Sequence, residues 1–506
     1  MERFAKQALQ ESLQAIRPGD DAAGRPFWNG SAASFVYAPA FAIAPRDGIA
    51  CYRFEVTDCK GELHSFEAAT PQAALSPIWG ELPPGRCTLD VRMLMGEYTT
   101  GFAGSRAFFK SAPFTGGYPA AARPYRQAAM MALEELMRNP HTQYWLEHGG
   151  PDPEYPLNCY PAKIFSALID GMCLLARLVP ARKDEASKAA RIVADCLLED
   201  SEPEGTPLEF MPHTYRGRNL TAGRYAGQNM MVYPCAAGLS YLRLAQLCGD
   251  ERYLDAACRI GESYLRLQLP NGTWHLKMDE ATGKPVGGNL AAEPDIADFL
   301  WQLAEKSGDA RFEEAARRIF GYLDQTLADS FNWEGQFEDV LPAEPYRNLA
   351  QHQAASLMML GLAHGWKAPV EMQKAREILR YCEDQFVFWE ANGVGSAGWH
   401  YPAVTEQYAY YVPVDASAAK MVMAFLAMYR ANPAENGLDL AKARALADSI
   451  TCIQDPSTGR IPTLWYDSFP EETDWTNCTV FSVNALAAID SVLGAGNPES
   501  RNIDGR

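Results

Sequence analysis

The stretch from Ala391 to Asp415, ANGVGSAGWHYPAVTEQYAYYVPVD, combines residue types that suit chemistry on a hydroxyl-rich ligand. It places Glu406 among aromatic residues, which lower the solvation of its carboxyl, raise its pKa and suit it to donate a proton. Loops longer than about 12 residues are uncommon unless they carry function. An aromatic plug that closes a helical core, with Glu406 as a structural acid, is the alternative. The aromatic candidates for ligand binding here are Trp399, His400, Tyr401, Tyr408 and Tyr410.

Four further acids lie in or next to other predicted loops. Glu293 and Asp295 fall at the start of a predicted helix, where the helix dipole and free backbone N–H groups favour an ionised base or nucleophile. An ordinary helix cap is the alternative for each. Glu338 and Asp339 are neighbours in GQFEDV, so only one of them can face a site from an extended segment. A solvated turn is the alternative for that pair.

Two carboxyl groups of this kind are what glycoside hydrolysis usually requires, one protonated and one ionised. We expect Glu406 to be the proton donor and Glu293 or Asp295 to be its favoured partner, with Glu338 or Asp339 as the reserve. A separation of about 6.5–9.5 Å between the two carboxyls leaves room for a water and is typical of enzymes that invert the configuration at the anomeric carbon. Opposed loops favour that larger gap, so we expect inversion.

Other predicted loops carry aromatic faces for stacking on a sugar and arginines that could clamp a carboxylate with two hydrogen bonds. The segment PHTYRGRNLTAGRY combines both kinds of residue, as a uronic acid would require. Ordinary surface ion pairing is the alternative for the arginines. The candidate binding residues outside the first stretch are His213, Tyr215, Arg218, Arg224, Trp274, His275, Arg347, His352, Trp465 and Trp475.

Composition excludes several classes of partner. The 506 residues carry a formal net charge of −18, which argues against nucleic acid or an anionic membrane. The N-terminal residues lack the apolar core of a secretory signal, and the 12 cysteines show no metal-ligand spacing. No phosphate loop or dinucleotide motif is present, so we expect no cofactor and no metal. The sequence predicts a cytoplasmic protein and is compatible with a homo-oligomer.

The elements that must position these residues fall into three parts. Residues 1–26 form a predicted helical extension, and residues 27–118 show short strand patterns typical of a fibronectin-like β-sandwich. Residues 119–506 show helical periodicity, and two turns share a phrase, GDERYLDAACRI and GDARFEEAARRI. The twelve predicted helices lie near 125–138, 161–178, 184–199, 234–247, 251–268, 291–306, 310–328, 349–365, 369–388, 415–430, 439–453 and 479–494.

Connections between these helices alternate between short turns and long linkers, which indicates six helical hairpins closed into a ring. The helices that follow long linkers should lie inside, with their N-termini pointing into a cleft that the linkers surround. These inner helices begin near residues 161, 234, 291, 349, 415 and 479. The long linkers are 139–160, 200–233, 269–290, 329–348, 390–414 and 454–478.

This organisation, with GTW, GQFED, GWHYP and GRIPTLW in successive loops, resembles the six-hairpin glycosidase superfamily and its (α/α)6 barrel over about residues 120–495. Within it, the unsaturated glucuronyl hydrolases and exo-β-glucuronidases are similar in placing an acid near the start of an inner helix, as AAEPDIADFLWQLAE does here. The resemblance implies a mainly α fold and a hydrolase that acts on a uronic-acid-containing oligosaccharide.

The same barrel supports other reactions. A uronate lyase or C5-epimerase would use tyrosine and histidine, and a sugar 2-epimerase would need two opposed histidines. A sugar-binding scaffold without catalysis is the third alternative. The candidates for the lyase are His213, Tyr215, His400 and Tyr401, and those for the 2-epimerase are His275, His352 and His400.

Overall fold

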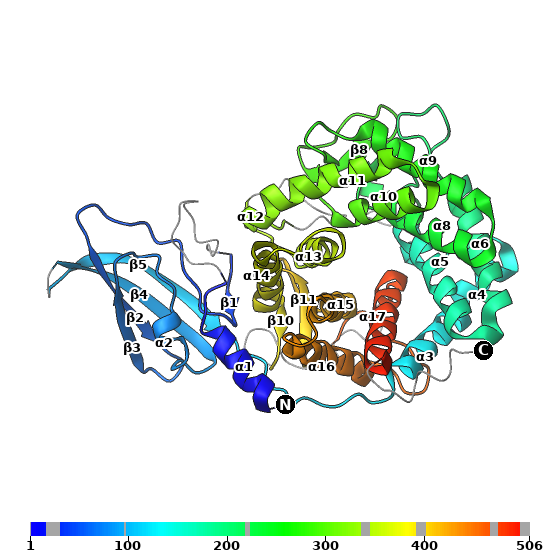
Figure 1. Ribbon diagram of the computed structural model, residues 1–506. Helices are drawn as coiled ribbons and strands as arrows, with labels where there is room; N and C mark the ends of the chain where they lie inside the picture. The colour runs from blue at the N-terminus through cyan, green and yellow to red at the C-terminus, as the bar shows by residue number, and fades with distance from the viewer. Residues whose placement is uncertain are drawn as a thin grey trace.

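The computed structural model describes residues 2–16, 31–95, 98–217, 223–334, 345–390, 401–465 and 474–495. Within them, a ring of helices lies beside a smaller sheet (Figure 1). The six inner helices are α5 (Pro161–Leu178), α8 (Pro234–Cys248), α10 (Pro294–Ser307), α13 (His352–His364), α15 (Asp415–Ala431) and α17 (Thr476–Ala495). The six outer helices are α3 (Tyr125–Arg138), α6 (Lys183–Glu199), α9 (Glu251–Leu267), α11 (Ala310–Tyr322), α14 (Pro369–Phe386) and α16 (Gly437–Ile453).

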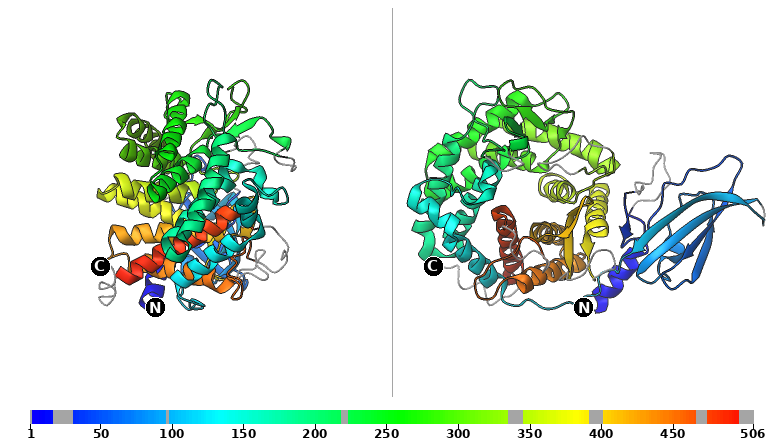
Figure 2. Two further views of the ribbon diagram at one scale, coloured as in Figure 1. Left: turned by 90° about the vertical axis from the view of Figure 1, so that its right-hand side faces the viewer. Right: turned by 180° about the vertical axis from the view of Figure 1, so that it is seen from behind.

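The ring is closed. Each inner helix packs against the next, and α17 packs back against α5, which completes the circle seen from the front in Figure 1 and from behind in the right-hand view of Figure 2. The twelve helices agree with the predicted ranges to within a few residues, apart from the last turns predicted after α11, which form a short π-helix (Leu323–Leu327) and α12 (Ala328–Ser330). The predicted six-hairpin ring is therefore confirmed.

Backbone hydrogen bonds join neighbouring linkers at the N-terminal end of the inner helices. Ala162 donates to His213, at the start of α5, and Gln351 donates to Glu406, next to the start of α13. Asp415, the first residue of α15, donates to Thr463. The linkers that precede α8, α15 and α17 thus meet the starts of other inner helices, as the sequence predicts.

Short elements stiffen this end of the ring. They are α4 (Pro140–His148), the 3-10 turn Pro156–Cys159 and three small antiparallel sheets, while a second 3-10 turn, Pro180–Arg182, follows the C-terminus of α5 at the other end. The sheets pair β6 (Gln228–Met230) with β8 (Lys277–Asp279), β7 (Trp274–His275) with β9 (Leu290–Ala291), and β11 (Ala403–Gln407) with both β10 (Val387–Phe388) and β12 (Tyr410–Pro413).

Close helix packing places the inner helices. On α8, a Cβ added to Gly238 would lie 2.2 Å from the ring of Phe299 on α10, so only glycine allows this approach. Among the described residues, Thr476–Gly494 is the one segment long and apolar enough to span a membrane. It belongs to α17 and packs against α3, α5 and α15 as part of the ring.

The N-terminal strands form one sheet rather than two. In the described residues the order is β1 (Ser34–Phe35), β5 (Tyr98–Lys110), β4 (Gly85–Met95), β2 (Cys51–Thr57) and β3 (Leu63–Ala68). The prediction of a β-sandwich is therefore not confirmed. The alternating pattern identifies strands that have one buried face, but it does not say whether a second sheet or another element covers that face. Here α2 (Ser76–Trp79) contributes to the cover: its Trp79 is fully buried and stacks on Phe108 of β5.

The sheet is attached to the ring through buried polar contacts. Asp384 on α14 accepts hydrogen bonds from the backbone N–H groups of Val36 (2.6 Å) and Tyr37 (2.7 Å). The Tyr37 hydroxyl donates to Glu383 (2.8 Å), which also pairs with Lys442 on α16. Helix α1 (Glu2–Ser12) lies against α16.

Candidate functional site

Two acids and a histidine meet at the N-terminal ends of α10 and α13. The His352 Nε2 atom lies 3.7 Å from Asp295 Oδ2 and 3.9 Å from Glu293 Oε1. One oxygen of each acid and one nitrogen of the histidine all lie within 4.8 Å of one another. The side chain of Glu293 is 7% exposed and that of Asp295 is 38% exposed, so the group reaches from a buried floor to an open edge.

The helix-cap alternative does not account for Glu293. It occupies the N-cap position of α10, but its side chain makes no capping hydrogen bond, and its Oε1 atom is buried without a hydrogen-bond partner. The side-chain oxygens of Gln351 and Gln353, at the start of α13, are also buried without a partner. Buried polar atoms are rarely left unsatisfied, so this cluster of orphaned acceptors is typical of a site that receives a ligand.

The two acids hold different protonation states at neutral pH. Burial raises the pKa of Glu293 to about 8, the neighbouring Asp295 carboxylate adds to the rise, and Lys420 on α15 opposes it. Burial also raises the pKa of Asp295, but Lys420 and His352 outweigh it and hold that pKa well below its usual range. Glu293 is therefore mostly protonated at pH 7 and Asp295 is ionised. Such a split separates an acid from a base.

His352 is neutral at pH 7. Burial lowers the pKa of its imidazole, Lys420 lowers it further, and the hydrogen bond and charge of Asp295 offset part of the change. A neutral imidazole can accept a proton or orient a carboxylate. The cluster could also offer two oxygens and one nitrogen to a metal ion, although the ammonium of Lys420 opposes a second cation there.

An aromatic wall with a lysine stands at the starts of α5, α8 and α17. The Lys163 Nζ atom lies 4.5 Å from the ring centre of Trp475 and 5.6 Å from that of Tyr233. Trp475 stacks on Tyr160 with ring centres 5.5 Å apart. Lys163 also lowers the pKa of His352, so its ammonium lies close enough to the candidate site to act on that imidazole.

Glu406, the expected proton donor, lies on β11 at the same end of the ring. Its backbone carbonyl accepts from Gln351, which directly precedes His352, and its side chain is half-buried. Its charge contributes to raising the pKa of the Cys478 thiol on α17. Its role as proton donor stays a prediction.

Several predicted binding residues are structural. Trp274 is 1% exposed and its indole N–H donates to the carbonyl of Tyr264 (2.8 Å), and Trp465 is also 1% exposed. Tyr215 is 2% exposed with its hydroxyl on the sulfur of Met230. These three rings are buried, because aromatic rings in loops can complete the core as readily as they line a cleft. Their contact with a sugar stays a prediction.

His213 is likewise held in a buried network. Its Nδ1 atom lies 2.7 Å from Glu280 and 3.5 Å from Glu202, and Arg216 bonds its other ring nitrogen. This leaves neither ring nitrogen available to a substrate. The predicted use of His213 as a lyase base is therefore wrong for this arrangement, and the neighbouring arginine disfavours a metal ion on the same ligands.

The remaining predicted binding residues differ in exposure. Tyr401 and Tyr410 are 43% and 39% exposed, and Arg224 and Arg347 are exposed, with the Arg224 guanidinium over Tyr225. The Tyr408 hydroxyl donates to Gln385, and His275 is half-buried with its Nδ1 atom unpartnered. The predicted residues Arg218, Glu338, Asp339, Trp399 and His400 lie outside the described residues.

The sequence analysis missed three charged residues on the inner helices. Lys163 and Lys420 lie in the first two turns of α5 and α15. Asp415 is fully buried, accepts from the backbone N–H of Ala416 (2.7 Å) and the hydroxyl of Ser482 (2.9 Å), and has its pKa raised well above the usual range by burial. A search for charges in the first two turns of every predicted inner helix would have found all three.

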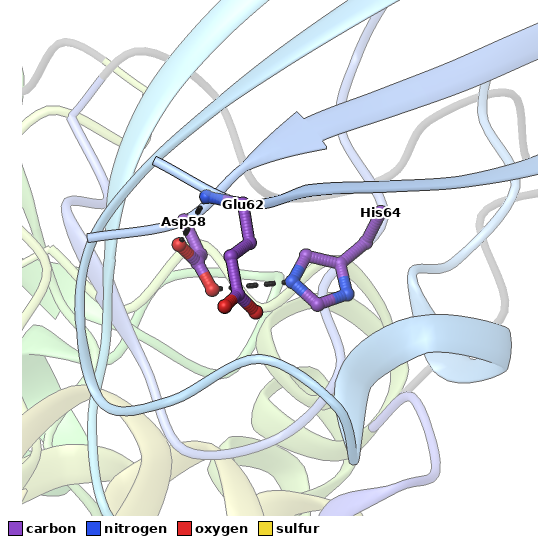
Figure 3. Close-up of side chains that lie close together, drawn as sticks. All are labelled: Asp58, Glu62 and His64. Carbon is purple, nitrogen blue, oxygen red and sulfur yellow. Dashed lines mark hydrogen bonds and ion pairs between the residues drawn. The ribbon is translucent and has the colours of Figure 1, made fainter. Parts of the chain in front are cut away.

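A second acid and histidine group lies in the N-terminal sheet, away from the ring (Figure 3). Asp58 accepts hydrogen bonds from the backbone N–H groups of Lys60 (2.8 Å) and Glu62 (2.9 Å) and lies 3.1 Å from His64 Nε2. These contacts close the turn between β2 and β3. The group is therefore explained as a turn.

Comparison with solved structures identifies the fold of the ring. A family 76 glycoside hydrolase from a bovine Bacteroides thetaiotaomicron strain matches with a TM-score of 0.51 and 11% identity, over 87% of this chain and 93% of that one. Cellobiose 2-epimerase from Spirochaeta thermophila matches with a TM-score of 0.53 and 13% identity, over 74% and 100% of the two chains. A D-mannose isomerase matches with a TM-score of 0.51 and 11% identity, over 73% and 97%.

These neighbours and the ring of this chain share one fold, the (α/α)6 barrel, so the fold that the resemblance implied is confirmed. They act on sugars by different reactions, so they fix the fold and leave the reaction to the residues of this site. No protein-family model matches the sequence. No curated protein matches it either.

Proposed function

We propose that the protein is an enzyme of carbohydrate metabolism, a glycoside hydrolase that acts on an oligosaccharide containing a uronic acid. The observation that carries this proposal is the close Glu293–Asp295 pair, with carboxyl oxygens within 4.8 Å of each other, in which burial raises the pKa of Glu293 while Lys420 and His352 lower that of Asp295. That pairing is what glycosidic bond cleavage requires. The fold shared with a glycoside hydrolase supports it.

Glu293 would donate its proton to the glycosidic oxygen as the bond between that oxygen and the sugar C1 breaks. The Asp295 carboxylate would form a bond to C1, and a water deprotonated by Glu293 would then release the sugar and restore both acids. Oxygens no more than 4.8 Å apart are nearer to the roughly 5 Å of retaining enzymes than to the 6.5–9.5 Å of inverting ones. For this pair we therefore expect retention, in place of the inversion expected for Glu406.

A uronic acid would fit the charges around the pair. Lys420 on α15 and Lys163 on α5 supply cations to the otherwise acidic site, and Lys420 is oriented by the hydroxyl of Ser356 (2.8 Å). Trp475 and Tyr233 offer flat faces for a sugar ring. The arginine clamp predicted from Arg224 remains a separate proposal, since that side chain is exposed in the linker before α8.

One observation favours a second candidate, a sugar epimerase or isomerase. The neutral His352 beside an ionised Asp295 has the form of a general base with its orienting carboxylate. Such a base would remove a proton from the carbon next to a sugar carbonyl and return it. The same base could serve a uronate lyase.

A single screen separates these reactions. The purified protein would be incubated in deuterated water with aryl β-glucosides, aryl β-glucuronides and free aldoses, and the products followed by proton NMR and ultraviolet absorbance. The proposal predicts free glucuronate with no deuterium on carbon and no unsaturated chromophore. Deuterium at C2 of an aldose would identify the epimerase or isomerase, and a new chromophore the lyase. Cleavage of none of the glycosides would contradict the hydrolase.

We also propose a cytoplasmic location. All 12 cysteines are free thiols, several of them buried, which suits a reducing compartment. Cell fractionation with an antibody to the protein tests this, and recovery from the culture medium would contradict it.

A further inference from the structure

A cavity lies outside the candidate functional site, between the outer helix α3 and the starts of α5 and α17. We call it the α3–α17 cavity. It has a volume of about 270 Å³ and shares none of the residues named above for the acid pair, the lysines or the aromatic wall. Figure 1 shows α3 beside α17, with α4 and α5 on the same side of the ring. Its polar lining includes Glu135, Asn139, His141, Asn158, Arg460 and Asp474.

The Glu135 carboxyl is the unusual member of this lining. It is half-buried on α3 and makes no hydrogen bond or ion pair with any described residue. Burial raises its pKa and the nearby Asp474 adds to the rise, while Arg460 opposes it. A carboxyl group that lines a cavity and has no partner among the described residues can accept a hydrogen bond from a ligand.

The other polar groups of the cavity are held in place by one bond and keep a second position for a ligand. His141 Nδ1 lies 2.7 Å from Asp152 Oδ2, and this contact lowers the pKa of Asp152, so Nδ1 donates and Nε2 keeps a position for a ligand. Asn158 donates its amide N–H to the Asp152 carbonyl (2.8 Å) and keeps its oxygen. Arg460 donates its Nε–H to Asp474 and keeps its two terminal nitrogens.

Aromatic rings flank these groups. Tyr155 stacks on His141 with ring centres 4.7 Å apart, and its hydroxyl bonds the carbonyl of Asp474 (2.9 Å) and the hydroxyl of Thr476 (3.1 Å). The cavity therefore offers both hydrogen-bond donors and acceptors beside a stacked pair of rings. It resembles in composition the sites that hold a ring of hydroxyl groups.

We propose that the α3–α17 cavity binds one uncharged sugar unit. Pockets for drug-sized ligands have volumes of about 300–1,000 Å³, so a slightly smaller space suits a single ring. The lining carries Glu135 and Asp474 against the single guanidinium of Arg460, which disfavours an anion. Donors and acceptors that line the same cavity favour a polyol over an apolar ligand. The proposal stands independently of the reaction at the candidate functional site.

The test is binding of D-glucose, D-mannose and D-galactose, each alone, to the full chain by calorimetry and saturation-transfer NMR, with D-glucuronate as the anionic comparison. At least one neutral sugar should bind, and an excess of glucuronate, which the candidate functional site would take, should not displace it. Glu135→Gln keeps the size of the side chain and should weaken that binding about ten-fold. Asn158→Ala, on another element, should weaken it as well.

Two control variants locate the binding. Glu134→Gln changes the neighbouring acid, which pairs with Arg182 outside the cavity, and should leave sugar affinity unchanged. Lys420→Met alters the candidate functional site and should also leave it unchanged. The proposal is overturned if no neutral sugar binds, if both Glu135→Gln and Asn158→Ala bind as the parent does, or if Lys420→Met removes the binding.

Discussion

Replacing Glu293 by glutamine removes the protonated carboxyl and keeps its shape. With a pKa of about 8, about ten Glu293 side chains are protonated at pH 7 for each ionised one, whereas an ordinary carboxyl with a pKa of 4.5 would be almost wholly ionised. Because the acid form donates the proton, activity of the parent should fall as pH rises through about 8. General acids typically contribute about 10²- to 10⁴-fold to a rate, so kcat of Glu293→Gln should fall by that factor on a natural glycoside.

The assay compares an oligosaccharide with a nitrophenyl glycoside of the same sugar between pH 5 and about 10. A nitrophenolate leaves without protonation, so kcat/KM on the nitrophenyl glycoside, which reports formation of the bond between C1 and Asp295, should fall much less in Glu293→Gln than kcat/KM on the oligosaccharide. The alkaline limb of kcat/KM near pH 8 should disappear. Glu406→Gln serves as the matched variant from the same end of the ring. Equal losses on both substrates, or an alkaline limb that survives in Glu293→Gln, would refute Glu293 as the donor. If Glu406→Gln alone shows the leaving-group effect, the role passes to Glu406.

Further predictions concern charge and packing. Lys420→Met should move the alkaline limb above pH 8, because Lys420 lowers the pKa of Glu293. It should also reduce kcat/KM on a glucuronide at least ten-fold more than on the matching glucoside. Lys284→Met, at an exposed site, should change neither the pH profile nor this ratio. Gly238→Ala should lower the free energy of unfolding by about 1–3 kcal/mol, because the new methyl group meets the ring of Phe299. Gly321→Ala is the control: no atom lies near its Cβ, so it should raise the free energy of unfolding by about 0.5–1 kcal/mol. Urea titration measures both.

The ring was predictable because its helices are long and their apolar spacing is regular. The inner helices α5, α8 and α15 begin within a residue of the positions that periodicity predicts, since proline or an acid marks each start. The sheet was less predictable: its strands were found, but whether a second sheet covers them depends on contacts far apart in sequence, such as Trp79 on Phe108.

The candidate site was predictable in part. Glu293 and Asp295 follow from their place at an inner helix, but their opposite protonation depends on Lys420 and His352, which approach from other hairpins. The aromatic residues misled for a physical reason: Trp274 has the same local sequence signals as a stacking residue, and only its hydrogen bond to Tyr264 shows that it belongs to the core. Residue type in a loop therefore indicates capability, and burial decides use.

The most direct test of the central claim is a crystal structure of Asp295→Asn with a uronic-acid-containing oligosaccharide bound. The account predicts that the glycosidic oxygen lies within hydrogen-bond reach of the Glu293 carboxyl, about 2.6–3.2 Å, with C1 of the cleaved sugar facing residue 295 and the uronate carboxylate near Lys420 or Lys163. A sugar bound at this end of the ring with its glycosidic oxygen directed away from Glu293, or bound elsewhere on the molecule, would contradict it.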